Sequence, residues 1–416
     1  MGRELASVAE EANRSLARSS AFAIFLAFLR LGCTSFGGPI AHLGYMRADL
    51  VAKRQWLTEA VFADIVALCQ FMPGPASSQT GMAIGLLRGG PLGMLAAWLG
   101  FTLPSALAMS AFAYGLGVMG DVSDAGWLRG LKLVAVAVVA QAVWGMARSL
   151  AAGRERASVA VAACLICLAV PSSLGQIGAI VMGAVVGTLL LPRVAVPCDR
   201  TAALNIRIPR AVSVALLAAF FVLLLGLPWI ADATGSHAVQ LVSTFYRAGS
   251  LVFGGGHVVL PLLQQSVVQP GWVDQDVFLA GYGATQAMPG PIFTFASFLG
   301  AVENPGPNGW LGALIATLSI FGPSFFLISG LLPFWDTLRH RPNVRAALSG
   351  VNAAVVGVLL AALYHPIWTG TIHHPVDFGF GLVAFLLLTV WALPPWCVVT
   401  IGAIAGWDMA AMGLFG

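Results

Sequence analysis

Two arginines, Arg30 and Arg247, lie inside long apolar segments, and each precedes a Phe-Gly-Gly motif by six residues. A charge at the centre of a bilayer costs about 2.5–3.5 kcal/mol on insertion scales, so a charge retained there indicates function. A guanidinium also donates two parallel hydrogen bonds, a geometry that suits an oxyanion. We therefore expect both arginines to face an anion. The alternatives for Arg30 are a snorkelling side chain and a structural ion pair with Asp64.

The Phe-Gly-Gly motifs are the first of two kinds of helix break. Pro39 follows the first motif and can begin a new half-helix, whereas Gly256 follows the second. Free N–H groups at the start of a half-helix carry partial positive charge and can hold an anion, and glycine lets a ligand approach the backbone. The alternative role of paired glycines is close helix packing. The candidate anion ligands here are Ser35, Phe36, Gly37, Gly38, Phe253, Gly254 and Gly255.

Two Met-Pro-Gly-Pro motifs, at 72–75 and 288–291, form the second kind of break, because proline removes a backbone donor and clashes with the preceding turn. A glutamine stands two residues before each motif. Its amide could donate to an oxyanion or satisfy a freed carbonyl, and the sequence leaves both roles open. The helix-breaking residues are Pro39, Met72, Pro73, Pro75, Met288, Pro289 and Pro291. The candidate ligands from these motifs are Gln70, Gly74, Gln286 and Gly290.

Few other residues offer chemistry. Asp64 lies in an apolar stretch and is a candidate proton carrier, because burial raises the pKa of a carboxyl, although a structural partner for Arg30 fits equally well. The cysteines lie mostly in apolar stretches and read as small buried residues. The pair His373-His374 has no third ligand nearby, so we expect no metal site and no cofactor.

These motifs belong to an internal repeat. Residues Phe28–Gly38 recur as Phe245–Gly255 at an offset of 217, and Trp56–Phe62 recur as Trp272–Phe278 at an offset of 216. The Met-Pro-Gly-Pro motifs recur at 216 as well. The expected divisions are an N-terminal arm (1–20), a first repeat (21–191), a linker with one apolar helix (192–236) and a second repeat (237–416).

Loop charge predicts that the repeats have opposite orientations. Of the 21 basic residues, 17 lie at or before Arg210 and 4 lie after it. The loop with Lys53 and Arg54 corresponds to one with Asp274 and Asp276. Because cytoplasmic loops favour Lys and Arg, equivalent loops should lie on opposite sides. The linker helix would supply the odd crossing that inverts the second repeat.

Charge also predicts the path inside each half. The segments 21–44 and 57–87 both begin and end near basic residues, and a break lies near the middle of each. Each arm is shorter than the roughly 20 residues that a span needs. We expect re-entrant helical hairpins: about nine full crossings and about four hairpins, or about 13 segments by hydropathy. The N-terminus would be cytoplasmic and the C-terminus periplasmic.

Composition places the whole chain in a membrane. Only 9% of the 416 residues are charged and 58% are apolar, whereas a soluble domain carries about 25% charged residues. Long apolar blocks argue against a membrane β-barrel and against disorder. An all-α polytopic membrane protein is expected. Residues 1–20 mix charges with small residues and are typical of a cytosolic arm rather than a signal peptide.

The Ser-Phe-Gly-Gly-Pro motif at 35–39, its Phe-Gly-Gly-Gly-His counterpart at 253–257 and the paired Met-Pro-Gly-Pro motifs resemble the chromate ion transporter family, in its long two-domain form. The resemblance covers nearly the whole chain. It implies export of chromate from the bacterial cytoplasm across the inner membrane, resistance to chromate, and sulfate as a competing analogue. The second motif has Gly256 where the first has Pro39, so the two breaks need not be chemically equivalent.

The resulting hypothesis is secondary active export by alternating access at an anion site between the repeats. The alternatives are a permease for sulfate or another oxyanion, and a potential-driven anion channel or uniporter. A chromate reductase would need a redox centre, which the scattered cysteines and the single histidine pair do not offer, so we expect no enzyme. The sequence has no ATP-binding motif, which argues against an ATP-driven pump. The expected partners are chromate, sulfate as an analogue, and membrane lipid, without nucleic acid. The sequence leaves open whether the chain forms a homodimer.

Overall fold

The computed structural model describes residues 19–119, 125–191, 208–253, 256–339 and 341–413. The N-terminal arm up to residue 18, linker residues 192–207, and Gly254 and Gly255 lie outside these ranges. Within them every regular element is a helix and none is a strand. Six helices are long and apolar enough to cross a membrane, and shorter apolar helices accompany them. The expected all-α fold is confirmed, and the six helices are consistent with a multi-pass membrane protein, while the number of crossings and the inverted repeats stay predictions.

Among the described residues, the first half and the linker supply eight α-helices. They are α2 (Ala21–Thr34), α3 (Gly38–Met46) with its π-helical extension η1 (Arg47–Lys53), α4 (Glu59–Phe71), α5 (Ala76–Met119), α6 (Gly126–Leu150), α7 (Arg154–Ala169), α8 (Ser173–Leu190) and, in the linker, α9 (Arg210–Thr234). Both predicted kinds of break are real interruptions: α2 ends before Phe36, and α4 ends before Met72.

The second half repeats this order with shorter pieces. Its elements are α10 (His237–Leu251), η2 (Gly256–Val258), α11 (Val259–Leu263), η3 (Gln264–Val268), α12 (Gln275–Ala287), η4 (Ile292–Thr294), α13 (Phe295–Val302), α14 (Gly309–Leu331), η5 (Leu332–Phe334), α15 (Trp335–Arg339), α16 (Pro342–Ala362), η6 (Leu363–Trp368), α17 (Pro375–Thr389) and α18 (Pro395–Ala411). The breaks again fall after α10 and after α12.

Helix α5 is two helices that fold back on each other at Gly90. This glycine has φ +64° and ψ −158°, far from helical values, and Pro91 follows it. Glycine adopts positive φ without the steric cost that a Cβ imposes. The backbones of Gly85 and Gly93 are therefore in contact across the turn. The arm before Gly90 returns from the break, and the arm after it is a long apolar helix.

The outer ends of the broken helices of each repeat are joined. In the first repeat the Ser19 N–H donates to the Arg88 carbonyl at 3.0 Å, and the Arg88 guanidinium donates to the Trp56 carbonyl at 3.4 Å. In the second repeat the Asn304 N–H donates to the Trp272 carbonyl at 3.0 Å. The two ends of each pair of broken segments thus lie side by side, away from the breaks.

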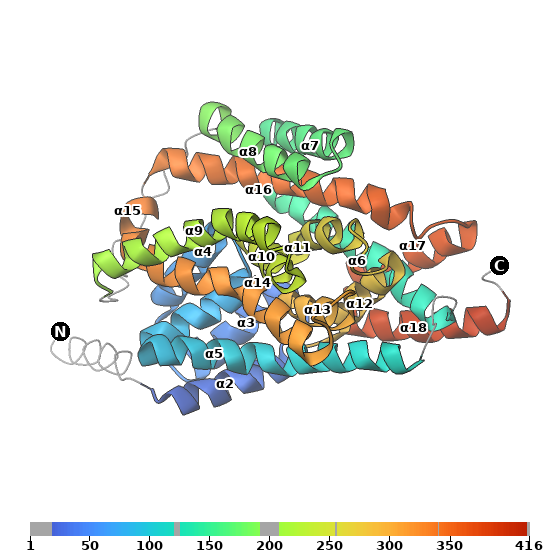
Figure 1. Ribbon diagram of the computed structural model, residues 1–416, viewed down its shortest axis with the longest axis horizontal. Helices are drawn as coiled ribbons and strands as arrows, with labels where there is room; N and C mark the ends of the chain where they lie inside the picture. Colours follow the sequence, from blue (N-terminus) through green and yellow to red (C-terminus); the bar gives the residue numbers. More distant parts are fainter. Residues whose placement is uncertain (1–18, 120–124, 192–207, 254–255, 340, 414–416) are drawn as a thin grey trace.

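The last helices of each half pack against the long helix of the other half (Figure 1). Helix α16 lies along α7 and α8, and α6 lies along α17 and α18. Glycines make these approaches possible: Gly350 contacts Gly183 and Gly187, while Gly130 contacts Gly402 and Gly406. Small residues let membrane helices approach closely where lipid provides no hydrophobic drive for association. The two halves are therefore interlocked.

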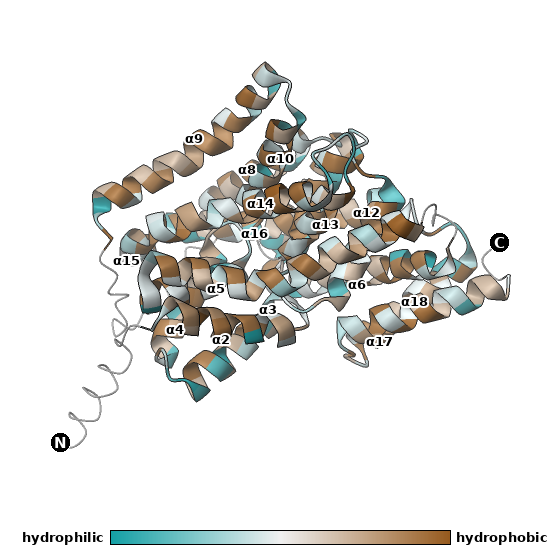
Figure 2. Ribbon diagram, turned by 60° about the horizontal axis from the view of Figure 1, so that its bottom comes forward, coloured by the Kyte–Doolittle hydropathy of each residue, from teal (hydrophilic) through white to brown (hydrophobic). Residues whose placement is uncertain are grey.

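Helix α9 lies at the edge of the bundle and is mostly apolar along its length, as the brown ribbon in Figure 2 shows. Two hydrogen bonds attach it to the second half: Ser213 Oγ donates to the Ser329 carbonyl, and Tyr246 Oη donates to the Phe220 carbonyl, both at 3.2 Å. Most of its apolar side chains face outward. It is suited to contact lipid while joining the two halves.

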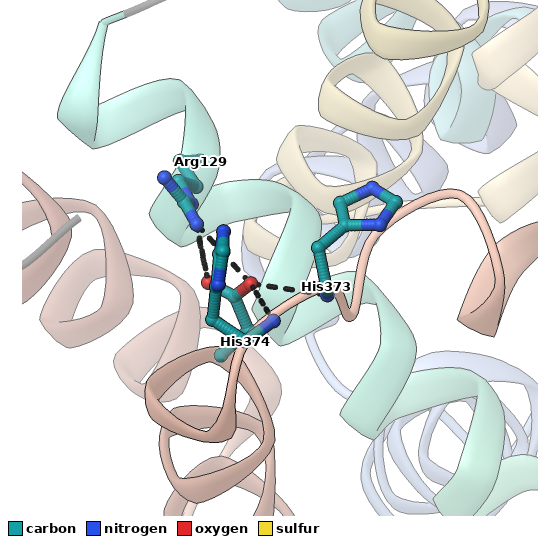
Figure 3. Close-up of polar contacts among 4 residues, drawn as sticks. Arg129, His373 and His374 are labelled. Atoms are coloured by element: carbon teal, nitrogen blue, oxygen red, sulfur yellow. Dashed lines mark hydrogen bonds and ion pairs between the residues drawn. The ribbon is translucent and has the colours of Figure 1, made fainter. Parts of the chain in front are cut away.

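A buried ion pair connects α6 to the start of α17 (Figure 3). Both oxygens of Asp377, which is fully buried, accept from the Arg129 guanidinium at 2.9–3.1 Å. The backbone N–H groups of His373 and His374 also donate to Asp377. The histidine pair therefore orders the entry to α17 through its backbone. No cluster of three metal-binding side chains occurs among the described residues.

We expect Asp377→Asn to destabilise the protein by about 1.5–3 kcal/mol, because it removes the buried carboxylate that accepts from the Arg129 guanidinium and from two backbone N–H groups. The thermal midpoint of the detergent-purified protein is the measurement. Asp408→Asn is the matched control, since Asp408 is exposed on α18. Equal midpoints for the two variants would contradict a structural role for the pair.

Candidate functional site

The four helix breaks meet through two reciprocal hydrogen bonds. The Gly74 N–H donates to the Val252 carbonyl at 2.7 Å, and the Gly290 N–H donates to the Ser35 carbonyl at 2.8 Å. Gly74 and Gly290 are related by the repeat offset of 216, and Ser35 and Val252 by the offset of 217. Each Met-Pro-Gly-Pro break is thus bonded to the Phe-Gly-Gly break of the other half.

The glycines of these breaks adopt conformations that other residues avoid. The φ angles of Gly37, Gly38, Gly74 and Gly290 lie between +81° and +118°, where an L side chain is strained. Space is also short: a Cβ on Gly290 would lie 2.8 Å from Ser105 Oγ. All four positions therefore favour glycine for their backbone conformation, and Gly74 and Gly290 also for close approach.

The two Phe-Gly-Gly breaks face each other. A Cβ built on Gly256 would lie 3.5 Å from Pro39 Cγ and 3.5 Å from Ile292 Cδ1. Pro39 and Gly256 are equivalent in the repeat. The two motifs therefore differ, proline against glycine, at the residues that contact each other. The predicted helix-breaking residues are therefore brought together at one junction between the halves.

Half-helices begin at this junction. Gly37 is the N-cap of α3, α5 begins directly after Pro75, and η4 leads into α13 directly after Pro291. The first turn of a helix has unsatisfied N–H groups and a partial positive charge. The junction thus collects several positive helix ends although no basic side chain belongs to its breaks.

Several buried donors near the junction have no hydrogen-bond partner among the described residues. They are the Ser35, Ser78 and Thr102 hydroxyls and the Gln286 amide nitrogen. Ser35 and Gln286 belong to breaks, and Ser78 follows Pro75 by three residues. Thr102 lies one turn before Ser105, which is next to Gly290. A buried polar group without a partner costs about 1–3 kcal/mol. Unpaired donors gathered beside positive helix ends are what an oxyanion would satisfy.

The two glutamines predicted as ligands are not equivalent in the structure. Gln286 is 8% exposed, whereas Gln70 is exposed on α4. Of the two phenylalanines, Phe36 is half-buried beside Trp396, with ring centroids 6.0 Å apart, and Phe253 is half-buried as well. Gln286 is therefore the better placed of the two amides for a ligand at the junction.

The two arginines lie in separate, repeat-related pockets rather than in one site. Arg30 is exposed in a pocket of about 210 Å³ that Tyr45, Asp49 and Lys53 also line. Arg247 lines a smaller pocket of about 30 Å³ with Ser266. Each pocket lies between a helix that leads to a break and the segment that returns from it. Their role in anion transport stays a prediction, as does that of Asp64, which is half-buried on α4 eight residues before Met72.

Sequence reasoning did not single out two histidines that follow the Phe-Gly-Gly breaks. His42 is buried, with Nδ1 3.3 Å from Ser77 Oγ, and His257 Nδ1 lies 2.8 Å from Tyr282 Oη. His257 directly follows the glycines of its break, and this position could have identified it as a site residue. His42 lies three residues after Pro39, and the repeat has no histidine at the equivalent position, so the sequence did not indicate it.

Comparison with known proteins decides the family. The family description "Chromate transporter" matches twice, over residues 22–188 and 239–407. The chain belongs to the chromate transporter family. Each match contains one Phe-Gly-Gly break and one Met-Pro-Gly-Pro break, and α9 falls between the two matches.

Three curated members of the chromate transporter family are similar along most of their length. A probable chromate transport protein of Synechococcus elongatus is 28% identical over 389 residues, covering 91% of this chain and 93% of that protein. A chromate transport protein of Pseudomonas aeruginosa is 28% identical over 81% of this chain and 78% of its own length. One of Cupriavidus metallidurans is 26% identical over 81% of this chain and 80% of its own length. No solved structure matches the chain.

Membership in the chromate transporter family makes this chain a multi-pass membrane transport protein and supports chromate as its substrate. The family is one of transporters rather than enzymes.

Proposed function

We propose that the protein exports chromate from the cytoplasm across the bacterial inner membrane, by alternating access at the junction of the four breaks, and so confers chromate resistance. The observation that carries this proposal is the pair of reciprocal hydrogen bonds, Gly74 to Val252 and Gly290 to Ser35, with unpaired buried donors around them. Interrupted helices in paired repeats are typical of transporters with a site near the midplane.

The chemistry of the junction fits a tetrahedral dianion. Its oxygens can accept from the hydroxyls of Ser35 and Ser78, from the Gln286 amide and from free backbone N–H groups at the half-helix starts. Hydrogen bonds to a charged acceptor contribute about 1.5–3 kcal/mol each. Phe36 and Phe253 would limit the size of the site.

Alternating access follows from the arrangement of the hairpins. If the repeats are inverted, the first pair of hairpins opens toward the cytoplasm and the second toward the periplasm. Arg30 and Arg247 would then attract the anion on the two sides of the junction, each from its own pocket. This orientation places the N-terminus in the cytoplasm and the C-terminus in the periplasm.

The membrane potential alone can drive export. A dianion leaving a negative-inside cell gains about 4.6 kcal/mol per 100 mV, from about 2.3 kcal/mol per charge. At 1.4 kcal/mol per decade this supports a gradient of about 10³-fold. Uniport and proton antiport are both feasible, and Asp64 is the proton carrier that the sequence offers.

The test is transport of radiolabelled chromate in proteoliposomes, with sulfate and molybdate as competitors. We expect chromate to be transported and sulfate to compete. If sulfate is transported while chromate is neither transported nor competes with sulfate, the protein is a sulfate permease and the proposal is overturned. Zero flux under a potential without a pH gradient would exclude uniport, and single-channel currents would indicate a channel.

We expect Arg30→Ala to lose chromate export while the protein still reaches the membrane, because the variant removes a cation from the entry pocket beside Lys53 and Asp49. Export of chromate from cells, normalised to the membrane-inserted protein, is the measurement. Arg156→Ala is the control, since Arg156 lies at the start of α7 and outside both arginine pockets. Wild-type export by the Arg30 variant would end its proposed role.

A further inference from the structure

The outer end of the second repeat holds a buried carboxyl beside a histidine. Glu303, at the end of α13, is only 2% exposed, and its Oε2 lies 3.3 Å from Nε2 of His237 at the start of α10. Its other oxygen has no partner among the described residues. The His237 ring packs edge-on against Trp272, with centroids 4.4 Å apart. One carboxylate oxygen is therefore buried without a donor.

The first repeat has a permanent cation in the turn where the second has this carboxyl. The offset of 216 relates Arg88 to Asn304, the neighbour of Glu303, and Trp56 to Trp272. The Arg88 guanidinium donates to Ser19 Oγ at 3.0 Å and lies 5.5 Å from the centre of the Trp56 ring. Arginine stays charged at any physiological pH, whereas a carboxyl beside an imidazole can gain and lose a proton. The equivalent turn thus carries a fixed charge in one repeat and a titratable group in the other.

A pocket lies close to Glu303 along the chain. It has a volume of about 820 Å³ and is lined by Ala301 and Val302, which precede Glu303, and by Asp274 and Asn308. Burial raises the pKa of the Glu303 carboxyl to about 8. This carboxyl is therefore protonated and neutral at pH 7 and ionised at pH 9.

Other charged groups near this position are few. Asp232 is exposed at the end of α9, and Asp274 is exposed and caps α12 through its side chain. Asp276 pairs with Lys132 at 3.0 Å. His237 is the hydrogen-bonding neighbour of Glu303 among the described residues, and α13 itself carries no charged side chain. A change of charge at Glu303 therefore acts mainly on His237 and on the start of α10.

We propose that Glu303 and His237 form a proton-binding site, and that proton uptake there drives chromate export as an antiport. The site holds the start of α10, whose other end carries Val252, the acceptor of the Gly74 hydrogen bond at the junction. Protonation of Glu303 would change how α10 is held against α13 and so act on the junction. The inference rests on the proposed export function and on the outward orientation of this end.

The test uses proteoliposomes loaded with radiolabelled chromate, with the external pH set between 7 and 9. Wild-type efflux should rise about tenfold toward pH 7, following the protonated fraction of a group with this pKa. Glu303→Gln resembles the protonated carboxyl in shape and charge, so it should lose the pH response and keep chromate–chromate exchange, which moves no net proton. Asp232→Asn is the control and should keep both.

A wild-type pH response in Glu303→Gln would overturn the proposal. If that variant does not assemble, His237→Gln leaves the carboxyl in place and should move the midpoint of the response. An unmoved midpoint would also overturn the proposal. Infrared spectroscopy of the purified protein should show a carboxyl band that titrates near pH 8 and is absent in Glu303→Gln. This measurement requires no chromate, so it distinguishes failure of this site from failure of the transport function.

Discussion

Gln286→Leu is expected to weaken chromate binding about 10- to 100-fold without destabilising the protein. The Gln286 amide is buried and its nitrogen has no partner among the described residues. Replacing an unsatisfied polar group by an apolar one of similar shape is neutral or stabilising, whereas a hydrogen bond to an anion contributes about 1.5–3 kcal/mol. Each 1.4 kcal/mol is tenfold in affinity. Equilibrium binding of radiolabelled chromate to purified protein, together with the thermal midpoint, measures both effects.

Gln264→Leu is the matched control for this prediction. Gln264 is also buried with an unpartnered amide nitrogen, but it lies on η3, beyond the half-helix that returns from the second Phe-Gly-Gly break. We expect it to leave chromate affinity unchanged. Equal loss of affinity in both variants, or a loss of stability that accounts for the loss in Gln286→Leu, would remove the amide from the site.

Gly74→Val is expected to abolish chromate transport. Gly74 has φ +118°, and a Cβ there would collide with the Gln79 amide and lie 3.2 Å from Ser324 Oγ. A β-branched residue in this region of backbone space costs about 1–3 kcal/mol. The strain falls on the residue whose N–H bonds Val252, so the junction between the halves should be displaced. Initial rates of chromate flux in proteoliposomes provide the measurement.

The control for the glycine variant is Gly226→Ala on α9, where no atom lies within 4 Å of the added Cβ. Alanine there should support normal flux, because it favours helix and meets nothing. Gly290→Val should behave like Gly74→Val, since it occupies the equivalent break. Normal flux in either break variant would show that the junction tolerates rearrangement and is not the transport site.

The positions of the breaks were predictable from the sequence because they depend on local chemistry. Pro-Gly-Pro cannot continue a helix, and α4 and α12 end before Met72 and Met288 as expected. Gly74 and Gly290, which the offset of 216 relates, also make equivalent hydrogen bonds. Local rules were enough to identify which segments carry the junction.

The surroundings of those breaks were not predictable, because burial depends on packing between distant segments. Gln70 and Gln286 have the same local sequence context, yet only Gln286 is buried. Arg30 and Arg247 share one motif, yet each lies in its own pocket. The pairing of Glu303 with His237 joins residues 66 positions apart. Sequence spacing alone carries no signal for such contacts.

The most direct test of the proposed binding site is the position of chromate in a crystal of the protein, read from the anomalous scattering of chromium. We expect one chromium site at the junction of the four breaks, within hydrogen-bonding distance of the Gln286 amide or the Ser35 hydroxyl. Chromium found only in the Arg30 or Arg247 pocket, or bound with equal occupancy in Gln286→Leu, would contradict this assignment.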